Sequence, residues 1–260
     1  RSFIARAHVL LAAEAARDPL AFDLRPLAVA STGWRILALL AHAATGAATA
    51  ATSIDTQLAR AWRAGPRGAE VIRQALILCA DHELNVSSFT ARCVASAGSH
   101  PYAVVTAGLA ALEGTRHGGT TARVESLLAT LRRNRQGPIA IRERLRRGER
   151  IDGFGHPLYR DGDPRAMALL DLLREKYPRS PELAFVLGVA RDAAAALRER
   201  PNLDFALGAA ARVLRLPPDS GLTLFAIGRT IGWIGHAIEQ YATGQLIRPR
   251  AKYVGVAPHS

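Results

Sequence analysis

Lysine and cysteine are scarce in this 260-residue chain, and strand-forming patterns are nearly absent. Only Lys176 and Lys252 are lysines, so 32 of the 34 basic residues are arginine. The cysteines, Cys79 and Cys93, form neither a CxxC pair nor a zinc-ligand spacing, which argues against a disulfide framework. Both lie in apolar helical surroundings, and we expect two buried free thiols in a reducing cytoplasm.

Long apolar runs are also rare. One uncharged run, Ile36–Ile54, is long enough to raise the question of a membrane span. It contains His42, Gly46 and Ser53, so a buried helix–turn–helix segment is the better interpretation. The chain shows no signal-peptide pattern. We therefore expect a cytoplasmic protein without a membrane partner.

The formal net charge of +12 favours polyanions or small acidic ligands. The sequence has no zinc-finger spacing, no RNA-binding aromatic motif and no long run of basic residues, so we expect no nucleic-acid partner. The short basic run Arg142–Arg150 includes two glutamates and is typical of a solvated helix face. The histidines lie far apart and no HExxH pattern occurs, so a metal site is not expected either.

Helical periodicity recurs along the chain and predicts an all-α fold. Up to residue 68, helices should be interrupted at Pro19, Pro26 and Gly65-Pro66. Further helices are expected over 68–79, from Pro101 to near Gly114, over 138–148, from Pro181 to about Arg200, and after Pro217-Pro218-Asp219.

Three of the predicted helices carry apolar stripes that should face the core. In the helix after residue 85 the stripe is Val86, Phe89, Cys93 and Val94. Further along, Thr121 should cap a helix with Val124, Leu127, Leu128 and Leu131 on one face. In the helix after residue 165, Leu169, Leu173 and Tyr177 should line one face.

The last long helix carries Gly228, Gly232 and Gly235. Each glycine in a helix interior costs about 1 kcal/mol relative to alanine. Three of them predict that another backbone, or a ligand, packs very close to this helix.

One stretch organises the chain, Gly153-Phe-Gly-His-Pro-Leu-Tyr-Arg-Asp-Gly-Asp-Pro-Arg165. Two glycines bring the backbone up to His156, and nine residues later Arg165 follows a second turn. A guanidinium is well shaped to grip a carboxylate, so the pair suggests a site that holds an acidic molecule and moves a proton. The alternative is a glycine-rich surface loop with an ordinary exposed histidine and arginine.

This stretch resembles the pattern of the citrate synthase family, and further segments match that family in the same order. They are Asp81-His-Glu-Leu-Asn85, Gly114-Thr-Arg-His-Gly-Gly119, Asn202-Leu-Asp204, and Gly228-Arg-Thr-Ile-Gly-Trp-Ile-Gly-His236, which leads into Glu239-Gln240 and Arg248-Pro249-Arg250. The resemblance covers about residues 70–255, and five motifs in register make it specific.

The resemblance implies a two-domain helical enzyme that condenses acetyl-CoA with oxaloacetate to give citrate and CoA. Residues 1–117 and 209–260 would form a large domain and residues 118–208 a small one, with the site in the cleft between them. No cofactor is implied, because the thioester itself supplies the activated carbon. The chain starts at Arg1 and lacks the N-terminal portion usual in the family, so we interpret it as an N-terminally shortened member.

By the same resemblance, Asp204 is the expected catalytic base, and the apolar residues after it would raise its basicity by desolvation. His117 would donate a hydrogen bond to the thioester oxygen. His156 would polarise the ketone and protonate the new alkoxide. Taken alone, Asp204 could be a plain helix-capping residue and His117 a plain loop histidine.

The remaining site residues would bind the substrates. His82 would contact oxaloacetate, and Arg165, Arg229 and Arg248 would clamp its carboxylates. In the family the last arginine reaches in from a partner subunit, so the resemblance implies a homodimer. Arg160 stands where the family contacts a CoA phosphate. Taken alone, His82 could be a capped surface histidine and Arg160 an exposed unpaired arginine.

The loop around His117 departs from the family pattern. The usual Gly-Pro-Leu-His-Gly-Gly-Ala-Asn is here Gly-Thr-Arg-His-Gly-Gly-Thr-Thr, and Arg116 would discourage a positive charge on His117. Two alternatives stay open. The chain could be a 2-methylcitrate synthase that uses propionyl-CoA, since one methyl group changes binding by only ~1–3 kcal/mol. It could also be a catalytically silent relative that binds a ligand.

Overall fold

A computed structural model describes residues 2–47, 52–133 and 138–255. These residues form twelve helices and no strand apart from one bridge pair, Phe154–Pro201, so the all-α prediction is confirmed. The helices are α1 (Phe3–Ala15), α2 (Pro26–Thr45), α3 (Ile54–Ala61), α4 (Gly65–Cys79), α5 (Val86–Ser96), α6 (Pro101–Glu113), α7 (Gly119–Arg133), α8 (Pro138–Arg146), α9 (Pro164–Lys176), α10 (Pro181–Leu197), α11 (Leu203–Val213) and α12 (Ser220–Thr243).

Most helix starts follow local chemistry that the sequence predicts. The Ser180 side chain accepts a hydrogen bond from the backbone of Leu183, and Pro181 takes the first helical position of α10. Pro101 begins α6 in the same way. α10 ends at Leu197, earlier than expected, because Arg198 adopts a left-handed conformation with φ 58°.

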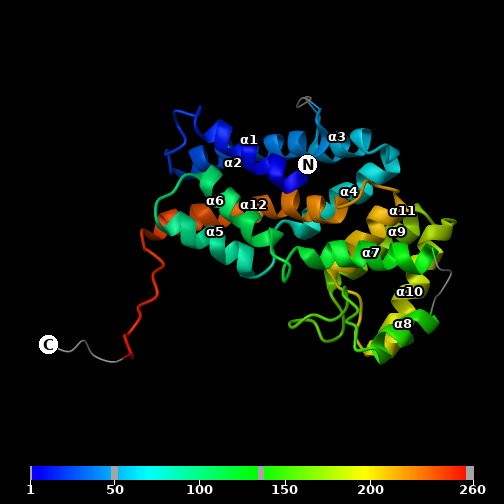
Figure 1. The fold of residues 1–260 in the computed structure, drawn as a ribbon. Coiled ribbons are helices and arrows are strands. Elements are labelled where there is room, and N and C mark those ends of the chain that lie inside the picture. Colours follow the sequence, from blue (N-terminus) through cyan, green and yellow to red (C-terminus); the bar gives the residue numbers. More distant parts are fainter. Residues whose placement is uncertain (1, 48–51, 134–137, 256–260) are drawn as a thin grey trace.

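Two groups of helices meet in the middle of the molecule. α12 packs against α2, α4, α5 and α6, while α11 packs against α7 and α9 (Figure 1). Contacts of α12 with α7 and α11, and of α4 with α9, join the groups. The junction is where the chain brings its charged motifs together. The division into residues 1–117 with 209–260 and residues 118–208 stays a prediction.

Two expectations about buried faces are wrong. In α5, Val86 is 58% and Phe89 45% exposed, because the small residues Ser87 and Ala91 form the buried face instead. Small side chains let α5 approach its neighbours, and the larger apolar residues are left on the outside. Cys93 is only partly buried, whereas Cys79 is fully buried as expected.

The predicted stripe of α7 is confirmed, but its start differs. Val124, Leu127, Leu128 and Leu131 are all buried. The helix already begins at Gly119, so Thr121 lies inside the first turn rather than before it. Its side chain is therefore available for a contact outside its own helix. In α9, Leu169 and Leu173 are buried and Tyr177 forms the C-terminal cap.

The glycines of α12 divide into two kinds. A Cβ on Gly228 would lie 2.6 Å from the Leu76 carbonyl oxygen, and one on Gly232 would lie 2.4 Å from that of Ala80. Here the backbone of α4 and the residue after it touch α12, as predicted. Gly235 has nothing within 4 Å of such a Cβ among the described residues, so close packing at this position stays a prediction.

The uncharged run divides between two helices. Its first part completes α2, a helix long and apolar enough by composition to cross a membrane, with 44% of its apolar window buried in the fold. Its end begins α3, and residues 48–51 lie outside the described residues. The buried part of α2 packs against α1, α3 and α12.

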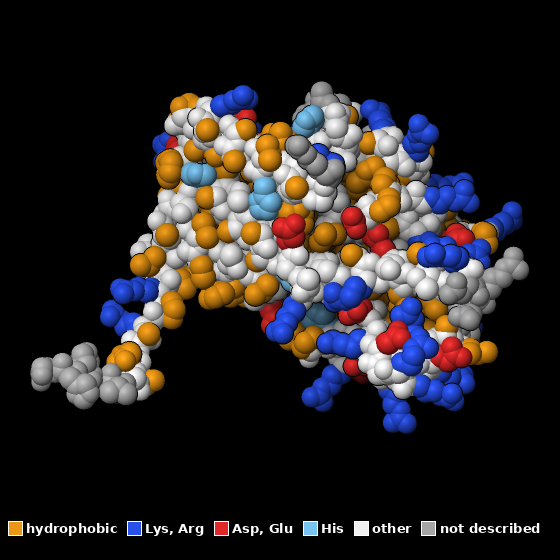
Figure 2. All heavy atoms as spheres, viewed as in Figure 1, with side chains coloured by type: hydrophobic (Ala, Val, Ile, Leu, Met, Phe, Trp, Pro, Cys, Tyr) orange, Lys and Arg blue, Asp and Glu red, His pale blue; other side chains and the backbone are white. Residues whose placement is uncertain are grey.

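Lysine and arginine side chains gather around α8, whereas hydrophobic side chains are more frequent over the half with α5 and α6 (Figure 2). The positive charge is thus unevenly distributed over this face of the molecule.

Candidate active site

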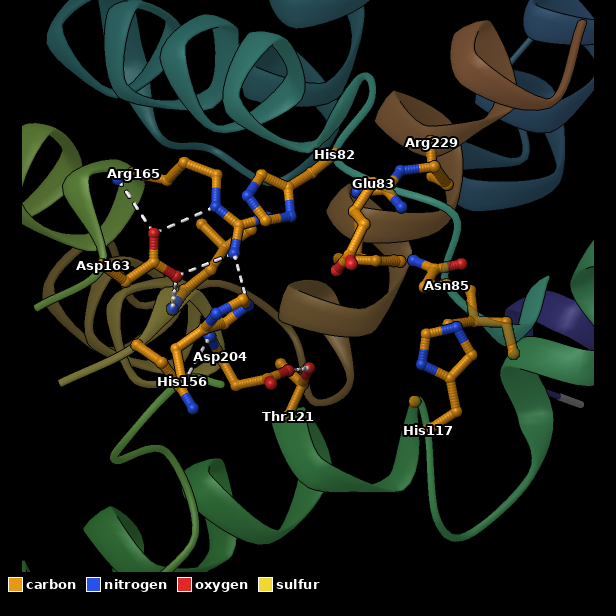
Figure 3. A pocket seen from close by; sticks show the side chains of 15 residues that line it. His82, Glu83, Asn85, His117, Thr121, His156, Asp163, Arg165, Asp204 and Arg229 are labelled. Atoms are coloured by element: carbon orange, nitrogen blue, oxygen red, sulfur yellow. Dashed lines mark hydrogen bonds and ion pairs between the residues drawn. The ribbon is translucent and has the colours of Figure 1, made fainter. Parts of the chain in front are cut away.

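A cleft of about 190 Å³ lies where the two groups of helices meet. It is lined by residues of the segment between α4 and α5, the end of α6, the starts of α7, α9 and α11 with the loops before them, and α12 (Figure 3). The polar ones are His82, Glu83, Asn85, His117, Thr121, His156, Asp163, Arg165, Asn202, Asp204 and Arg229. The cleft therefore unites six of the eight predicted site residues from five distant motifs.

Two glycines shape the loop that presents His156. Gly153 has φ 92° and Gly155 φ 74°, a region that other residues adopt only at a cost. The backbone N–H of Leu158 donates to Nδ1 of His156 at 3.2 Å. Nε2 lies 3.4 Å from an Arg165 nitrogen. Burial and the charge of Arg165 lower the pKa of His156, so its imidazole is neutral at pH 7.

Asp163 holds Arg165 in place. Nε and Nη2 of Arg165 donate to the two oxygens of Asp163 at 3.0 and 2.8 Å. The same carboxylate accepts the backbone N–H of Leu203 at 3.1 Å, which ties α9 to the start of α11. Although burial acts to raise the pKa of Asp163, the hydrogen bonds and charge of Arg165 lower it overall. The arginine that faces the cleft is thus fixed from behind.

His82 lies in the segment after α4, beside the His156 loop. Its Nε2 lies 2.6 Å from the Tyr159 hydroxyl, and its ring centre lies 5.4 Å from that of His156. Burial and the charge of Arg165 lower the pKa of His82 as well. Two neutral imidazoles therefore stand side by side near a guanidinium.

His117 faces the cleft from the turn before α7. Its Nε2 lies 2.9 Å from the hydroxyl of Ser87, which donates to Asn85 at 2.9 Å. Burial and the charge of Arg229 lower its pKa, so the neutral form expected from the sequence follows from a different cause. Arg116, invoked for that purpose, is exposed and does not line the cleft.

Asp204 is the second residue of α11, and Asn202 caps that helix by accepting the backbone N–H of Asp204 at 3.1 Å. Burial raises the pKa of Asp204, as the apolar surroundings predict. The hydroxyl of Thr121 donates to Oδ1 of Asp204, which opposes that rise (Figure 3). A carboxylate that is costly to keep ionised is a stronger base than one in water.

Arg229 is 1% exposed and enters the cleft from α12. Its Nε donates to the Cys79 carbonyl at 2.7 Å, and its guanidinium lies 4.9 Å from the ring centre of Phe225. Among the described residues, its Nη1 has no hydrogen-bond partner. A buried guanidinium nitrogen without a partner is suited to an anionic ligand.

Two predicted residues lie elsewhere. Arg160 is exposed on the loop after His156 and does not line the cleft. Arg248 is exposed in the segment after α12, which leads away from the body of the molecule (Figure 1). The single chain therefore does not bring either arginine into the cleft.

Sequence reasoning missed three residues that organise the site. Asn202 caps α11 and also donates to the Gly155 carbonyl at 3.0 Å, which joins the His156 loop to the Asp204 helix. Ser87 contacts His117, and Thr121 contacts Asp204. Asn202 stands within a recognised motif, but nothing in the sequence pairs residues 30 and 83 positions apart.

No group of three or more histidine, cysteine or acidic side chains that could hold a metal occurs in the described part of the chain. The cleft offers instead two guanidiniums, three neutral imidazoles and two buried carboxylates, of which Asp163 is paired with Arg165. Such a set can bind an acidic small molecule, accept a proton at Asp204 and donate hydrogen bonds from imidazole N–H groups.

The fold and the cleft define an all-α protein with a cleft lined by guanidinium, imidazole and carboxylate side chains. The model of the citrate synthase C-terminal domain matches residues 10–250. The chain belongs to the citrate synthase family.

Individual relatives agree with this assignment. Citrate synthase 2 of Bacillus subtilis is 37% identical over 73% of this chain and 52% of its own length. The 2-methylcitrate synthase 2 of Corynebacterium glutamicum is 34% identical over 73% of this chain and 50% of its own. The chain thus spans about half the length of the curated relatives it matches.

Two solved structures have the same fold. Citrate synthase of Thermoplasma acidophilum, in a ternary complex with carboxymethyl coenzyme A and oxaloacetate, superposes with a TM-score of 0.77 at 25% identity, covering 99% of this chain and 74% of its own. Citryl-CoA lyase of Hydrogenobacter thermophilus gives 0.71 at 25% identity, covering 81% of this chain and 87% of its own.

Proposed function

We propose that this protein condenses acetyl-CoA with oxaloacetate to give citrate and CoA, without a cofactor. One observation carries the proposal. A buried carboxylate with a raised pKa, Asp204, shares a cleft with the unpartnered guanidinium nitrogen of Arg229 and with neutral imidazoles. These are the groups that proton abstraction next to a thioester, beside a bound dianion, requires.

Oxaloacetate would bind first to the positive part of the cleft. Arg165 and Arg229 would hold its carboxylates by charge-assisted hydrogen bonds, and His82 would contact it from the side. Because Asp163 already fixes Arg165, little side-chain freedom would be lost on binding. His156 would donate its Nε2 proton toward the ketone oxygen, since its Nδ1 accepts from the backbone. The Arg165 nitrogen 3.4 Å from Nε2 would turn to a substrate carboxylate.

Asp204 would remove a proton from the methyl group of acetyl-CoA. As the enol forms, Ser87 would turn its hydroxyl proton from Asn85 to Nε2 of His117, and the neutral imidazole would donate from Nδ1 to the thioester oxygen. The enol carbon would then attack the ketone carbon of oxaloacetate. A new carbon–carbon bond forms, and the ketone oxygen takes the proton from His156. Water would hydrolyse the resulting citryl thioester and release CoA.

The CoA portion and the partner subunit complete the proposal. Arg160, exposed at the end of the His156 loop, would contact a CoA phosphate. Arg248 would act in the cleft of a second copy, because its own chain leads it away from the body. The apolar outer residues Ile77, Phe89 and Ile231, which are 60%, 45% and 53% exposed, offer a surface for that second copy.

We also propose a cytoplasmic location, which suits two free cysteines.

Two other reactions use the same site. One curated relative is named a 2-methylcitrate synthase, which supports propionyl-CoA as the alternative acyl donor. This chain covers 87% of the lyase but 74% of the Thermoplasma acidophilum citrate synthase. This supports cleavage of citryl-CoA into acetyl-CoA and oxaloacetate as a second candidate reaction. That reaction is the reverse of the condensation step and needs the same acid and base.

A thiol-release assay tests the proposal. With oxaloacetate present, acetyl-CoA should release free CoA, and replacing it with propionyl-CoA should lower kcat/KM. Faster release from propionyl-CoA would instead identify a 2-methylcitrate synthase. Cleavage of citryl-CoA without thiol release would identify a lyase. A protein that binds oxaloacetate but is inactive in every assay would be a silent relative.

A further inference from the structure

We propose that Thr121 is a positioning residue for Asp204. Its hydroxyl holds one carboxylate oxygen, so that the other stays free for the substrate's proton, and it keeps the buried carboxylate ionised. The inference rests on the proposed function for its catalytic meaning, but the hydrogen bond and its effect on the pKa of Asp204 do not depend on that function.

Packing fixes the direction of the Thr121 hydroxyl. Thr121 is 1% exposed in the first turn of α7. On one side its methyl group meets α12, where a Cβ on Gly221 would lie 2.6 Å from Cγ2. On the other side its Oγ1 donates to Oδ1 of Asp204. Since the methyl group is confined against a glycine, rotation that would break the hydrogen bond is disfavoured.

The same three helices are held together on both sides of this contact. One turn further along α7, the Glu125 carboxylate accepts the backbone N–H of Gly221 at 2.9 Å and that of Asp219 at 3.0 Å. A Cβ on Gly208 of α11 would lie 2.7 Å from Val124 Cγ1. The separation of α7 from α11 and α12 is therefore set independently of the Thr121 hydroxyl.

The charged groups around Asp204 partly cancel in their effect on its pKa, so the Thr121 hydrogen bond matters for its ionisation. Arg165 at the start of α9 favours the carboxylate, and so does Arg123 on α7. Arg123, however, is paired with Asp152 at 2.7 Å, and Asp152 acts in the opposite direction. In the part of the chain that the structure describes, Thr121 supplies the side-chain hydrogen bond to the Asp204 carboxylate. The threonine stands where the family pattern has asparagine, so this arrangement is a feature of the present loop.

Three variants and a control separate this role from simple packing. Thr121→Val keeps the shape but removes the hydroxyl, Thr121→Ser keeps the hydroxyl but removes the methyl group, and Thr121→Ala serves if the valine variant does not fold. The control is Thr223→Val, which removes another largely buried hydroxyl, whose partner is the backbone carbonyl of Asp219 just before α12. The titration of the Asp204 carboxyl would be followed by carbon-13 NMR, with the signal assigned from its absence in Asp204→Asn.

Removing a donor to the ionised form should raise the pKa of Asp204, so Thr121→Val should titrate at higher pH than the wild type. Thr223→Val should titrate as the wild type does. Thr121→Ser should titrate closer to the wild type than Thr121→Val does, because it keeps the donor but not the methyl group that fixes the direction of the hydroxyl. In the thiol-release assay Thr121→Val should lose ~10–100-fold in kcat with little change in KM for oxaloacetate, because the base is no longer held in line.

An unchanged Asp204 titration in Thr121→Val would overturn the inference, as would a serine variant that behaves like the valine variant. Because the titration needs no turnover, it separates two failures. A wild type that releases no thiol while Thr121→Val still shifts the titration would defeat the proposed function and leave the role of Thr121 intact.

Discussion

At the scale of single residues, two buried carboxylates in one cleft have opposite pKa shifts. Asp163 sits between Arg165 and a backbone N–H, and its pKa is lowered. Asp204 has burial with one hydroxyl donor, and its pKa is raised. The first carboxylate is ionised at a gain to the folded state and the second at a cost. The ionised Asp163 therefore stabilises the folded protein, whereas the ionised Asp204 destabilises it and is a stronger base than a carboxylate in water.

This contrast predicts opposite effects of the same substitution. At pH 7, Asp163→Asn should reduce the free energy of unfolding by ~3–5 kcal/mol, because Arg165 loses its buried partner. Asp204→Asn should increase it, because a desolvated charge disappears. Denaturant unfolding at pH 7 would measure both. A destabilised Asp204→Asn protein would contradict the raised pKa.

The pH dependence of the two effects follows from linkage. The contribution of Asp163 is present above the unfolded carboxyl pKa of ~3.9 and is lost as the pH falls through its lower folded value. The cost of Asp204 appears as the pH rises above ~3.9 through its higher folded value, so Asp204→Asn should match the wild type in acid. The gain from Asp204→Asn should therefore shrink toward pH 4.

At this scale the sequence located most of the cleft residues but not their partners. The motifs placed His82, His156 and Arg165 because glycine, proline and spacing mark such sites locally. The hydrogen bond of Thr121 to Asp204 and the effect of the Arg229 charge on the pKa of His117 arise from helix packing between distant segments. For that reason the sequence analysis attributed the neutral form of His117 to the wrong arginine, Arg116.

At the scale of elements, the contact between α12 and α4 depends on backbone approach at Gly228. This contact also carries the site, because Arg229 donates to the Cys79 carbonyl at the end of α4. A side chain at position 228 would push the two helices apart and move the arginine with them.

Gly228→Ala should therefore reduce the free energy of unfolding by ~1–3 kcal/mol, since a Cβ there meets the Leu76 carbonyl oxygen at 2.6 Å. It should also weaken oxaloacetate binding through Arg229. Gly188→Ala in α10 is the matched control. No described atom lies within 4 Å of a Cβ at that position, so the higher helix propensity of alanine should stabilise the protein by ~0.5–1 kcal/mol. Equal effects of both variants would argue against the close contact.

The helices themselves could be predicted because prolines, caps and 3.6-residue periods are local signals. Which face of each helix is buried was harder to predict. In α5 the stripe of Val86 and Phe89 suggested a core face, yet these residues lie on the outside and small residues face inward. A single-chain pattern cannot separate a core face from an apolar surface, and this surface is where the proposed second subunit would pack.

At the scale of the whole molecule, the exposed apolar residues of α4, α5 and α12 and the outward course of Arg248 lead to the same proposal. Hydrophobic side chains run along the edge of α5 (Figure 2). The intact protein should therefore have the mass of a dimer in solution at micromolar concentration. A monomeric mass would count against both the dimer and the role of Arg248.

A mixed dimer tests whether Arg248 acts across the interface. Asp204→Asn and Arg248→Ala chains should each be nearly inactive alone. When they are produced together, half of the dimers are mixed, and one site in each mixed dimer combines an intact Asp204 with the partner's intact arginine. Activity should return to about a quarter of the wild-type level per site. No recovery in a confirmed mixed dimer would place Arg248 in its own chain's site or outside catalysis.

The most direct test of the central claim is exchange of the methyl protons of acetyl-CoA with deuterated solvent, in the presence of an oxaloacetate analogue that cannot react. Mass spectrometry of the recovered acetyl-CoA would report the rate. If Asp204 is the base, the wild type should exchange, and Asp204→Asn should exchange ~10²–10⁴-fold more slowly. The Arg165→Ala variant should exchange at close to the wild-type rate once the analogue is saturating, because this substitution weakens binding of the analogue but leaves the base in place. Exchange by Asp204→Asn at the wild-type rate would contradict the account.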